Sequence, residues 1–145
     1  MKIFLYFLLG QSSLFAGEMT FQGPCEERPF LSSREVTAGA SVGEMTIATL
    51  KKSQISFVGN VAGINSIMGT PIGDGAKEVI SDTHMRAYGW CYEVDGFRPA
   101  TMPDKIILKG TENIRWFFAY SNYQDGTWRD YCTPSYTIKP KFLCP

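Results

Sequence analysis

The sequence lacks an excess of either charge, a long apolar run and any nucleotide-binding motif. Its 145 residues carry 14 Lys and Arg against 14 Asp and Glu, whereas nucleic-acid binders usually display a basic patch. A helix that crosses a bilayer needs about 20 apolar residues, and the apolar run at residues 3–9 is far shorter. Neither G-x-x-x-x-G-K-[ST] nor G-x-G-x-x-G occurs. These absences argue against nucleic-acid binding, nucleotide binding and a membrane-spanning mature chain.

The residues that build metal sites and catalytic centres are also scarce. His84 is the single histidine, no C-x-x-C pair exists, and Asp74 stands alone, so neither zinc nor calcium binding is expected. Asp82 and His84 would form only two thirds of a triad, and no nucleophile motif accompanies them. We therefore expect no metal, no cofactor and no enzymatic activity. The alternative is a small exported hydrolase that uses two of the 14 acids, brought together by the fold.

The N-terminal segment has the order of features found in secretory signal peptides. Lys2 supplies a positive charge, an apolar stretch follows, and Ala16 is a small residue at the exit. We expect residues 1–16 to be a signal peptide that is removed after Ala16. The mature chain is then expected in the periplasm or outside the cell, with no stable membrane insertion.

The cysteines all fall within residues 17–145. An even number of cysteines in an exported chain indicates disulfides, because that compartment is oxidising. Four cysteines allow three pairings, and the sequence leaves the choice open. Since the first and last lie near the two ends of the mature chain, at least one bridge is expected to tie a terminus to the body. The four are Cys25, Cys91, Cys132 and Cys144.

One helix start is clearly marked. Ser41 is followed three residues later by Glu44, the pattern of a capping box in which each side chain satisfies a free amide at the helix N-terminus. The helix is expected to continue through Lys52, with Ile47 and Leu50 toward the core.

Strand and turn patterns dominate the remaining sequence. Residues 28–40 fit either a short strand or an irregular edge segment, and 70–83 has the composition of a long loop. Within 88–94, Trp90, Tyr92 and Val94 share one face, and Asp95-Gly96 makes a turn. One helix among several short strands predicts an α+β fold. Short strands are expected at 55–58, 64–68, 88–94, 105–108 and 114–120.

The order of these segments resembles the transcobalamin-like C-terminal domain, a domain of unknown function in exported bacterial proteins. The matching motifs after the helix are S-I-M-G (66–69), G-W-C-Y-E-V-D-G (89–96), D-K-I-I-L-K-G (104–110) and I-R-W-F-F (114–118). The resemblance covers about residues 40–120. It departs where the family usually has asparagine, here Asp95, and an acidic residue, here Thr111.

This resemblance implies a β-grasp-like fold, in which a small mixed β-sheet packs on one short helix. Residues 17–145 would form a single domain with disulfide-tied termini. In transcobalamins the domain caps a corrinoid whose main pocket belongs to a separate helical domain. Because that helical partner is missing from this sequence, the lone cap is not expected to bind a corrinoid.

Aromatic residues make up 14% of the chain. A small sheet under one helix needs large side chains, so core packing is the first explanation for the aromatics of 88–94 and 114–120. The functional alternative is a partly exposed platform that stacks a flat ligand or a sugar ring. Tyr88, Tyr123 and Trp128 are expected to be the more exposed, and N-Y-Q-D-G-T-W (122–128) suits either a recognition loop or a plain hairpin. The candidate ligand-binding residues are Tyr88, Trp90, Tyr92, Trp116, Tyr123 and Trp128.

The sequence therefore predicts an exported, non-enzymatic module. It is expected to bind a small ligand, a glycan or an envelope protein through its aromatic strand edges and loops. A purely structural or interaction protein of the envelope is a further alternative, beside the small hydrolase.

Overall fold

The computed structural model describes residues 16–145. The predicted signal peptide therefore lies outside the described residues, apart from Ala16. Within the described part, no helix has both the length and the apolar character needed to span a membrane.

The described chain is built mainly from strands. One α-helix, α1, spans Val42–Lys52, and three short 3₁₀ helices connect other elements: η1 (Gly73–Ala76), η2 (Pro103–Lys105) and η3 (Ser135–Thr137). The strands are β1 (Glu18–Gln22), β2 (Pro29–Ser33), β3 (Phe57–Asn60), β4 (Gly63–Ile67), β5 (Lys77–Ser81), β6 (His84–Val94), β7 (Asn113–Gln124) and β8 (Thr127–Pro134).

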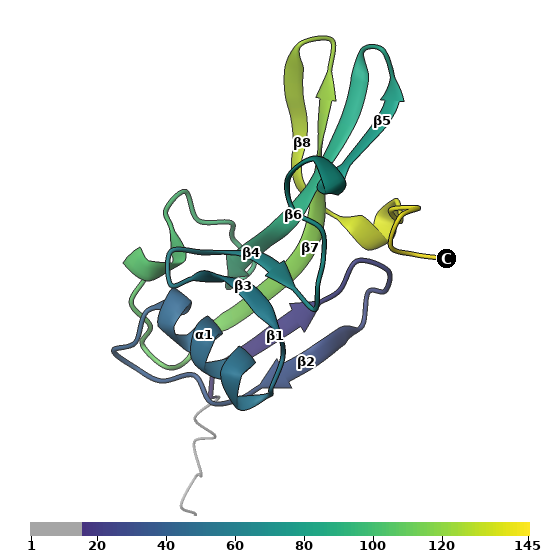
Figure 1. The fold of residues 1–145 in the computed structure, drawn as a ribbon. Coiled ribbons are helices and arrows are strands. Elements are labelled where there is room, and N and C mark those ends of the chain that lie inside the picture. The colour runs from purple at the N-terminus through teal and green to yellow at the C-terminus, as the bar shows by residue number, and fades with distance from the viewer. Residues whose placement is uncertain (1–15) are drawn as a thin grey trace, which may run out of the picture.

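A long β6–β7 ladder is the spine of the main sheet. It runs without interruption from the Val94–Ile114 pair to the His84–Gln124 pair. The strand order is β2-β1-β7-β6-β5, and β8 pairs with the half of β7 that β1 leaves free. Only β1 and β7 are parallel. The hairpin β3–β4 forms a separate small sheet beside α1 (Figure 1).

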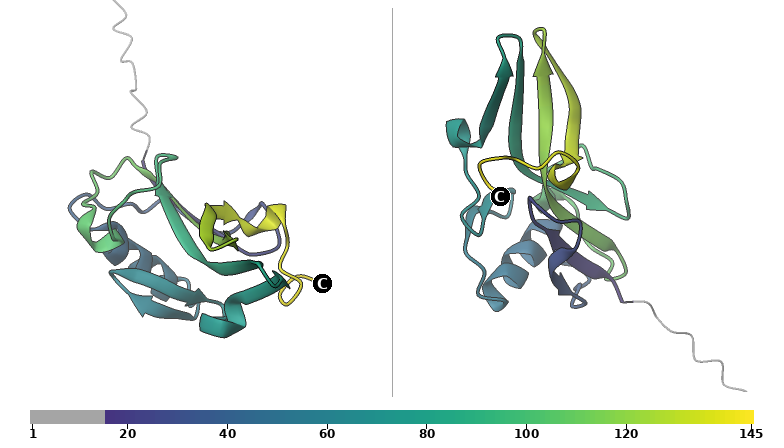
Figure 2. Two further views of the ribbon diagram at one scale, coloured as in Figure 1. Left: turned by 90° about the horizontal axis from the view of Figure 1, so that it is seen from above. Right: turned by 90° about the vertical axis from the view of Figure 1, so that its right-hand side faces the viewer.

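The far half of the spine projects beyond the body of the molecule. There β5 and β8 flank β6 and β7, and the two hairpins rise together from the part that carries α1 (Figure 1; Figure 2, right). We call residues 77–87 and 121–130 the finger. Asp125 and Gly126 make the β7–β8 turn with φ of 49° and 79°, the left-handed conformation that tight hairpin turns require.

The two faces of the main sheet have different surroundings. The face that carries Ile114 and Trp116 packs against α1, and we call it the helix face. Met19 and Phe21 of β1 and Leu50 of α1 complete its fully buried centre. Side chains alternate along a strand, so Cys91 and Phe117 point to the opposite face, which we call the disulfide face.

Helix α1 begins as the sequence predicts. The Ser41 side chain accepts a hydrogen bond from the Glu44 amide at 3.1 Å, and the Glu44 carboxylate accepts one from the Ser41 amide at 2.8 Å. These two bonds confirm the capping box, and the hydrogen bonds from Ser41 lower the pKa of Glu44. Gly43 lets the β3–β4 hairpin approach the helix, because a Cβ there would lie 1.8 Å from the carbonyl oxygen of Val61.

The predicted fold class is wrong. Strands account for 45% of the structure and helices for 16%, so the protein has a β-rich fold with a curled mixed sheet, only one end of which packs on the helix, and not the balanced α+β, β-grasp-like fold that the sequence predicted. The physical reason is length. An 11-residue helix covers only one end of the sheet, and the finger extends well past it (Figure 1).

Two local predictions also differ from the structure. Residues 77–81, expected within a loop, form β5, whereas 122–128 adopt the hairpin alternative, with β8 following the turn. Residues 105–108 are not a strand; only an isolated bridge joins Ile107 to Ser41. Polar residues caused the error at 77–81, because strands at the rim of a sheet carry exposed polar side chains that resemble those of loops.

Both disulfides join segments far apart in the sequence. Cys25 pairs with Cys144 across 119 residues, and Cys91 pairs with Cys132 across 41. The first bridge ties the loop after β1 to the C-terminal segment, and the two lie side by side in Figure 2 (left). The second links β6 to β8 over β7. The prediction of disulfides is confirmed, and this content fits an oxidising compartment.

Candidate functional site

The six aromatic residues singled out in the sequence divide into a group in the body of the molecule and a pair on the finger. Trp116 is 2% exposed, and its indole N–H donates to the Thr46 hydroxyl at 2.8 Å. Tyr92 stacks on Trp116 with ring centroids 5.1 Å apart. These two residues hold α1 against the sheet, which is the packing role that the sequence already favoured.

Tyr88 is buried, contrary to the expectation that it is exposed. Its ring stacks on Phe118 at 6.0 Å, and Phe142 of the C-terminal segment packs edge-on against it at 5.3 Å. The hydroxyl donates to Glu78 at 3.0 Å. The C-terminal segment, which Cys144 anchors, therefore covers this part of the helix face.

Burial, followed by the hydrogen bond to Glu78, raises the pKa of Tyr88 to about 12. Because the folded pKa lies above the unfolded value near 10, the stabilisation is complete below that value and is lost as the pH rises through about 12. An alkaline titration followed by phenolate absorbance is expected to show one late-ionising tyrosine that is missing in Tyr88→Phe. Identical curves for the two proteins would contradict this assignment.

Trp90 lies at a small hollow beside the first disulfide. Its indole N–H donates to the Thr70 hydroxyl at 2.9 Å, and Phe30 packs edge-on at 6.4 Å. The hollow measures about 270 Å³ and includes Cys25 and Met68 in its lining. Its volume lies just below the range of about 300–1,000 Å³ that is usual for small-molecule pockets.

Tyr123 and Trp128 form the second group, on the finger; Trp128 is exposed, whereas Tyr123, also expected to be exposed, is half-buried. They face each other across β7 and β8 with ring centroids 5.1 Å apart. Tyr123 is in turn paired with Met85 of β6, and Met85 with Val79 of β5. Directly opposed residues of neighbouring strands point to the same face, so these four side chains form one row across all four strands. We call Val79, Met85, Tyr123 and Trp128 the tip row.

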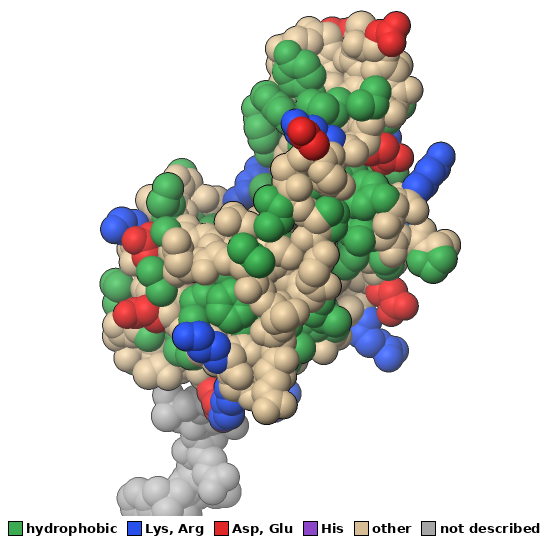
Figure 3. Space-filling model, in the orientation of Figure 1, with side chains coloured by type: hydrophobic (Ala, Val, Ile, Leu, Met, Phe, Trp, Pro, Cys, Tyr) green, Lys and Arg blue, Asp and Glu red, His purple; other side chains and the backbone are tan. Residues whose placement is uncertain are grey.

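The tip row is accessible and borders a hollow. Val79 is 76% exposed and Trp128 39%. A hollow of about 460 Å³ is lined by Val79, Met85 and Tyr123, together with the residues of both hairpin turns, among them Asp82 and Asp125. Figure 3 shows hydrophobic side chains on the surface of the finger and acidic ones near its tip. The site thus combines an apolar centre with an acidic rim.

The helix face of the finger is polar. Arg86 lies 3.6 Å from the Glu78 carboxylate, and a ring nitrogen of His84 lies 3.0 Å from the amide oxygen of Asn122. Asn122 also donates to Asp130 at 2.8 Å. This hydrogen-bonded network suits contact with water, so the two faces of the finger differ sharply in character.

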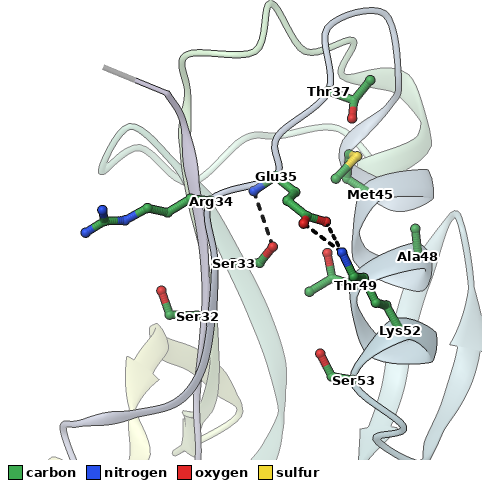
Figure 4. Close-up of a pocket in the computed structure, with 10 residues that line it drawn as sticks. All are labelled: Ser32, Ser33, Arg34, Glu35, Thr37, Met45, Ala48, Thr49, Lys52 and Ser53. Carbon is green, nitrogen blue, oxygen red and sulfur yellow. Dashed lines mark hydrogen bonds and ion pairs between the residues drawn. The ribbon is translucent and has the colours of Figure 1, made fainter. Parts of the chain in front are cut away.

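A larger hollow lies elsewhere, between β2 and α1. It measures about 590 Å³ and is partly open to solvent. In Figure 4 the side chain of Glu35 reaches across it to Lys52, with the ammonium nitrogen 2.7 Å from one carboxylate oxygen. We call it the β2–α1 groove; its lining residues are Ser32, Ser33, Arg34, Glu35, Thr37, Met45, Ala48, Thr49, Lys52 and Ser53.

The sequence analysis did not single out the β2–α1 groove or the non-aromatic half of the tip row. Val79 lay in a segment expected to be a loop, and Met85 preceded the expected strand. The hydroxyl-rich run at 32–37 was a possible signal for an edge strand, since 28–40 already fitted such a segment. Its position beside α1 depends on long-range pairing with β1, which has no local signature.

The described residues, 16–145, contain no cluster of three or more His, Cys, Asp or Glu side chains placed to hold a metal ion. The carboxylate of Glu112 has a structural role. Burial disfavours the charged form of Glu112, but backbone N–H groups of Lys109, Gly110 and Thr111 outweigh it and lower the pKa of this carboxyl. Glu112 thereby fixes the turn before β7.

No protein-family model, no curated protein and no solved structure matches this chain. The resemblance to the transcobalamin-like domain therefore stays a prediction, and the function has to be argued from the geometry of the sites.

Proposed function

We propose that this protein is an exported, non-enzymatic binding module that holds another protein through the tip row. The observation that carries the proposal is the alignment of Val79, Met85, Tyr123 and Trp128 across four strands at the projecting end of the molecule. Cores of protein interfaces are enriched in tyrosine, tryptophan and methionine and depleted of charge. The tip row has this composition.

The surroundings of the tip row favour a protein over a small ligand. Asp82 and Asp125 stand at the two turns that border the row, and an acidic rim around an apolar centre complements a partner with an apolar patch surrounded by lysines or arginines. The row is spread across four strands and is not enclosed, whereas small ligands are usually held in pockets that bury most of their surface.

The non-enzymatic part of the proposal is supported by two titratable groups of the finger, His84 and Glu78, whose side chains already have partners within the protein. The His84 ring is already hydrogen-bonded to Asn122. The Glu78 carboxylate accepts a hydrogen bond from Tyr88 and forms an ion pair with Arg86. A general base must be within hydrogen-bond reach of the proton that it removes. Export of the module through the predicted signal peptide at 1–16 is supported by the two disulfides.

Replacing two apolar side chains of the tip row is expected to dissociate the protein from its partner. In Val79→Ser/Trp128→Ser, the fraction of the protein that elutes with a partner from native extracts should fall at least about ten-fold, because a single tryptophan at an interface centre often contributes about 2 kcal/mol or more. The measurement is size-exclusion chromatography with immunodetection of the protein from the cells that produce it.

The matched control is Val58→Ser/Phe97→Ser. These two side chains are also apolar, at 53% and 79% exposure, but lie outside the finger. The control should elute with the partner as the unaltered protein does. If the tip-row and control variants behave alike, the tip row is not the binding surface.

A further inference from the structure

In the part of the chain that the structure describes, β2 has an outer edge with which no other strand pairs. It stands at the end of the sheet order and bonds to β1 on one side only, through pairs such as Thr20–Ser32. Within the described chain, residues 29–36 make no other backbone–backbone hydrogen bond. In an antiparallel pair, alternate residues direct their N–H and C=O groups away from the partner. The edge therefore presents a row of free donors and acceptors.

Helix α1 turns this edge into a groove. β5 and β8 also have outer edges, but they belong to the finger, far from the helix (Figure 1). Beside β2, the last two turns of α1 run alongside the strand and leave a space of about 590 Å³ between them (Figure 4). A strand edge with a helix parallel to it is the geometry in which an added strand also gains side-chain contacts.

The residues that line the groove suit a polypeptide with short, mostly polar side chains. Hydroxyls of Ser33, Thr49 and Ser53 line it, while Met45 and Ala48 provide an apolar strip on the helix. The ion pair between Glu35 and Lys52 spans the opening, but the two side chains are 66% and 68% exposed. Exposed pairs of this kind contribute at most about 1 kcal/mol, so a ligand can displace this one at little cost.

We propose that the β2–α1 groove binds an extended peptide segment of another protein, which pairs with β2 as an additional strand. The peptide backbone satisfies the free groups of residues 29–33, and a small apolar side chain points to Met45 and Ala48 between polar neighbours. This surface is separate from the tip row, so the protein has two binding surfaces.

The test uses the full disulfide-bonded protein and a phage-displayed library of random peptides about a dozen residues long. Selected peptides are synthesised and their affinities measured by calorimetry. Ala48→Trp fills the groove and should weaken binding at least about ten-fold. Lys51→Trp, an exposed neighbour on α1 outside the lining, should leave the affinity unchanged. Thermal unfolding of both variants verifies that they are folded.

A second readout tests backbone pairing itself. N-methylation of alternate peptide amides should abolish binding in one alternating set and spare the other, because only every second residue of a strand bonds to a given neighbour. Amide hydrogen exchange of residues 30–34 should slow when the peptide is bound.

Four outcomes would overturn the proposal. They are a library that yields no binder, equal affinity for the two tryptophan variants, binders lost in Val79→Ser/Trp128→Ser, and protection of 30–34 that depends on protein concentration without peptide. The third would place the peptide on the finger, and the fourth would assign the edge to a second copy of this chain. The first, second and fourth outcomes do not depend on whether the tip row binds a partner, so failure of the tip-row proposal leaves them unchanged.

Discussion

Replacing Cys25 and Cys144 together by alanine is expected to lower the free energy of unfolding by about 4–5 kcal/mol. The bridge closes a loop of 119 residues, and the entropy that a crosslink removes from the unfolded chain grows with loop length. Cys91→Ala/Cys132→Ala, which opens a 41-residue loop, should cost about 4 kcal/mol on the same relation. Urea denaturation followed by circular dichroism measures both.

The first bridge also has a structural role that loop entropy does not include. It holds the C-terminal segment, and with it Phe142, against Tyr88. Loss of the bridge should therefore also expose Tyr88 and remove its late ionisation. If Cys25→Ala/Cys144→Ala unfolds at the same urea concentration as the unaltered protein and Tyr88 still ionises late, the C-terminal segment does not depend on this disulfide.

Trp116→Ala is the second substitution with a large expected effect, a loss of about 3–5 kcal/mol of stability. The side chain is 2% exposed and lies between α1 and the sheet, so its removal leaves a cavity that the surroundings fill only in part. The hydrogen bond to Thr46 is also lost. The measurement is again urea denaturation.

Two variants separate the contributions at Trp116. Thr46→Val leaves the buried indole N–H without its partner, which should cost about 1–3 kcal/mol. Trp128→Ala removes the same side chain from the exposed finger and should change stability by no more than about 0.5 kcal/mol. Equal losses in Trp116→Ala and Trp128→Ala would contradict the assignment of Trp116 to the packed core and of Trp128 to the exposed surface of the finger.

The elements predicted correctly from the sequence are those with local chemical signatures. Ser41 and Glu44 specify a helix start through side chains three residues apart. Alternation along 88–94 and 114–120 fixes which side chains share a face, and Asp95-Gly96 marks the turn. Each of these features depends on residues that are neighbours in the chain.

The features that the sequence could not determine depend on contacts between segments that are far apart in the chain. Alternation shows that Trp116 and Tyr120 share a face, but not that α1 covers one end of that face and leaves the finger open. The sequence alone does not show whether Cys25 or Cys91 pairs with Cys144. The choice depends on the fold, which brings the loop after β1 next to the C-terminal segment. The β2–α1 groove exists because β2 pairs with β1, and β1 with β7, which no local pattern encodes.

The fold class was predicted wrongly for a related reason. A capping box marks a helix clearly in the sequence, whereas polar strands at the rim of the sheet, such as β5 and β8, have no comparable local pattern. A fold class predicted from local patterns therefore overestimates the share of helix. The same polar residues concealed Val79 and Met85, which belong to the tip row. Exposed apolar side chains in such strands were the signal that distinguished them from loop residues.

The most direct test of the proposed function places a photo-crosslinking amino acid, benzoylphenylalanine, at Tyr123 in the protein in the cells that produce it. We expect irradiation to yield an adduct with one partner protein, identified by mass spectrometry, and the adduct to be lost when Val79→Ser and Trp128→Ser are added. The same probe at Phe97, outside the finger and 79% exposed, should not capture that partner. Capture of the same protein with equal yield from both positions, or no adduct from Tyr123, would contradict the assignment of the tip row as the binding surface.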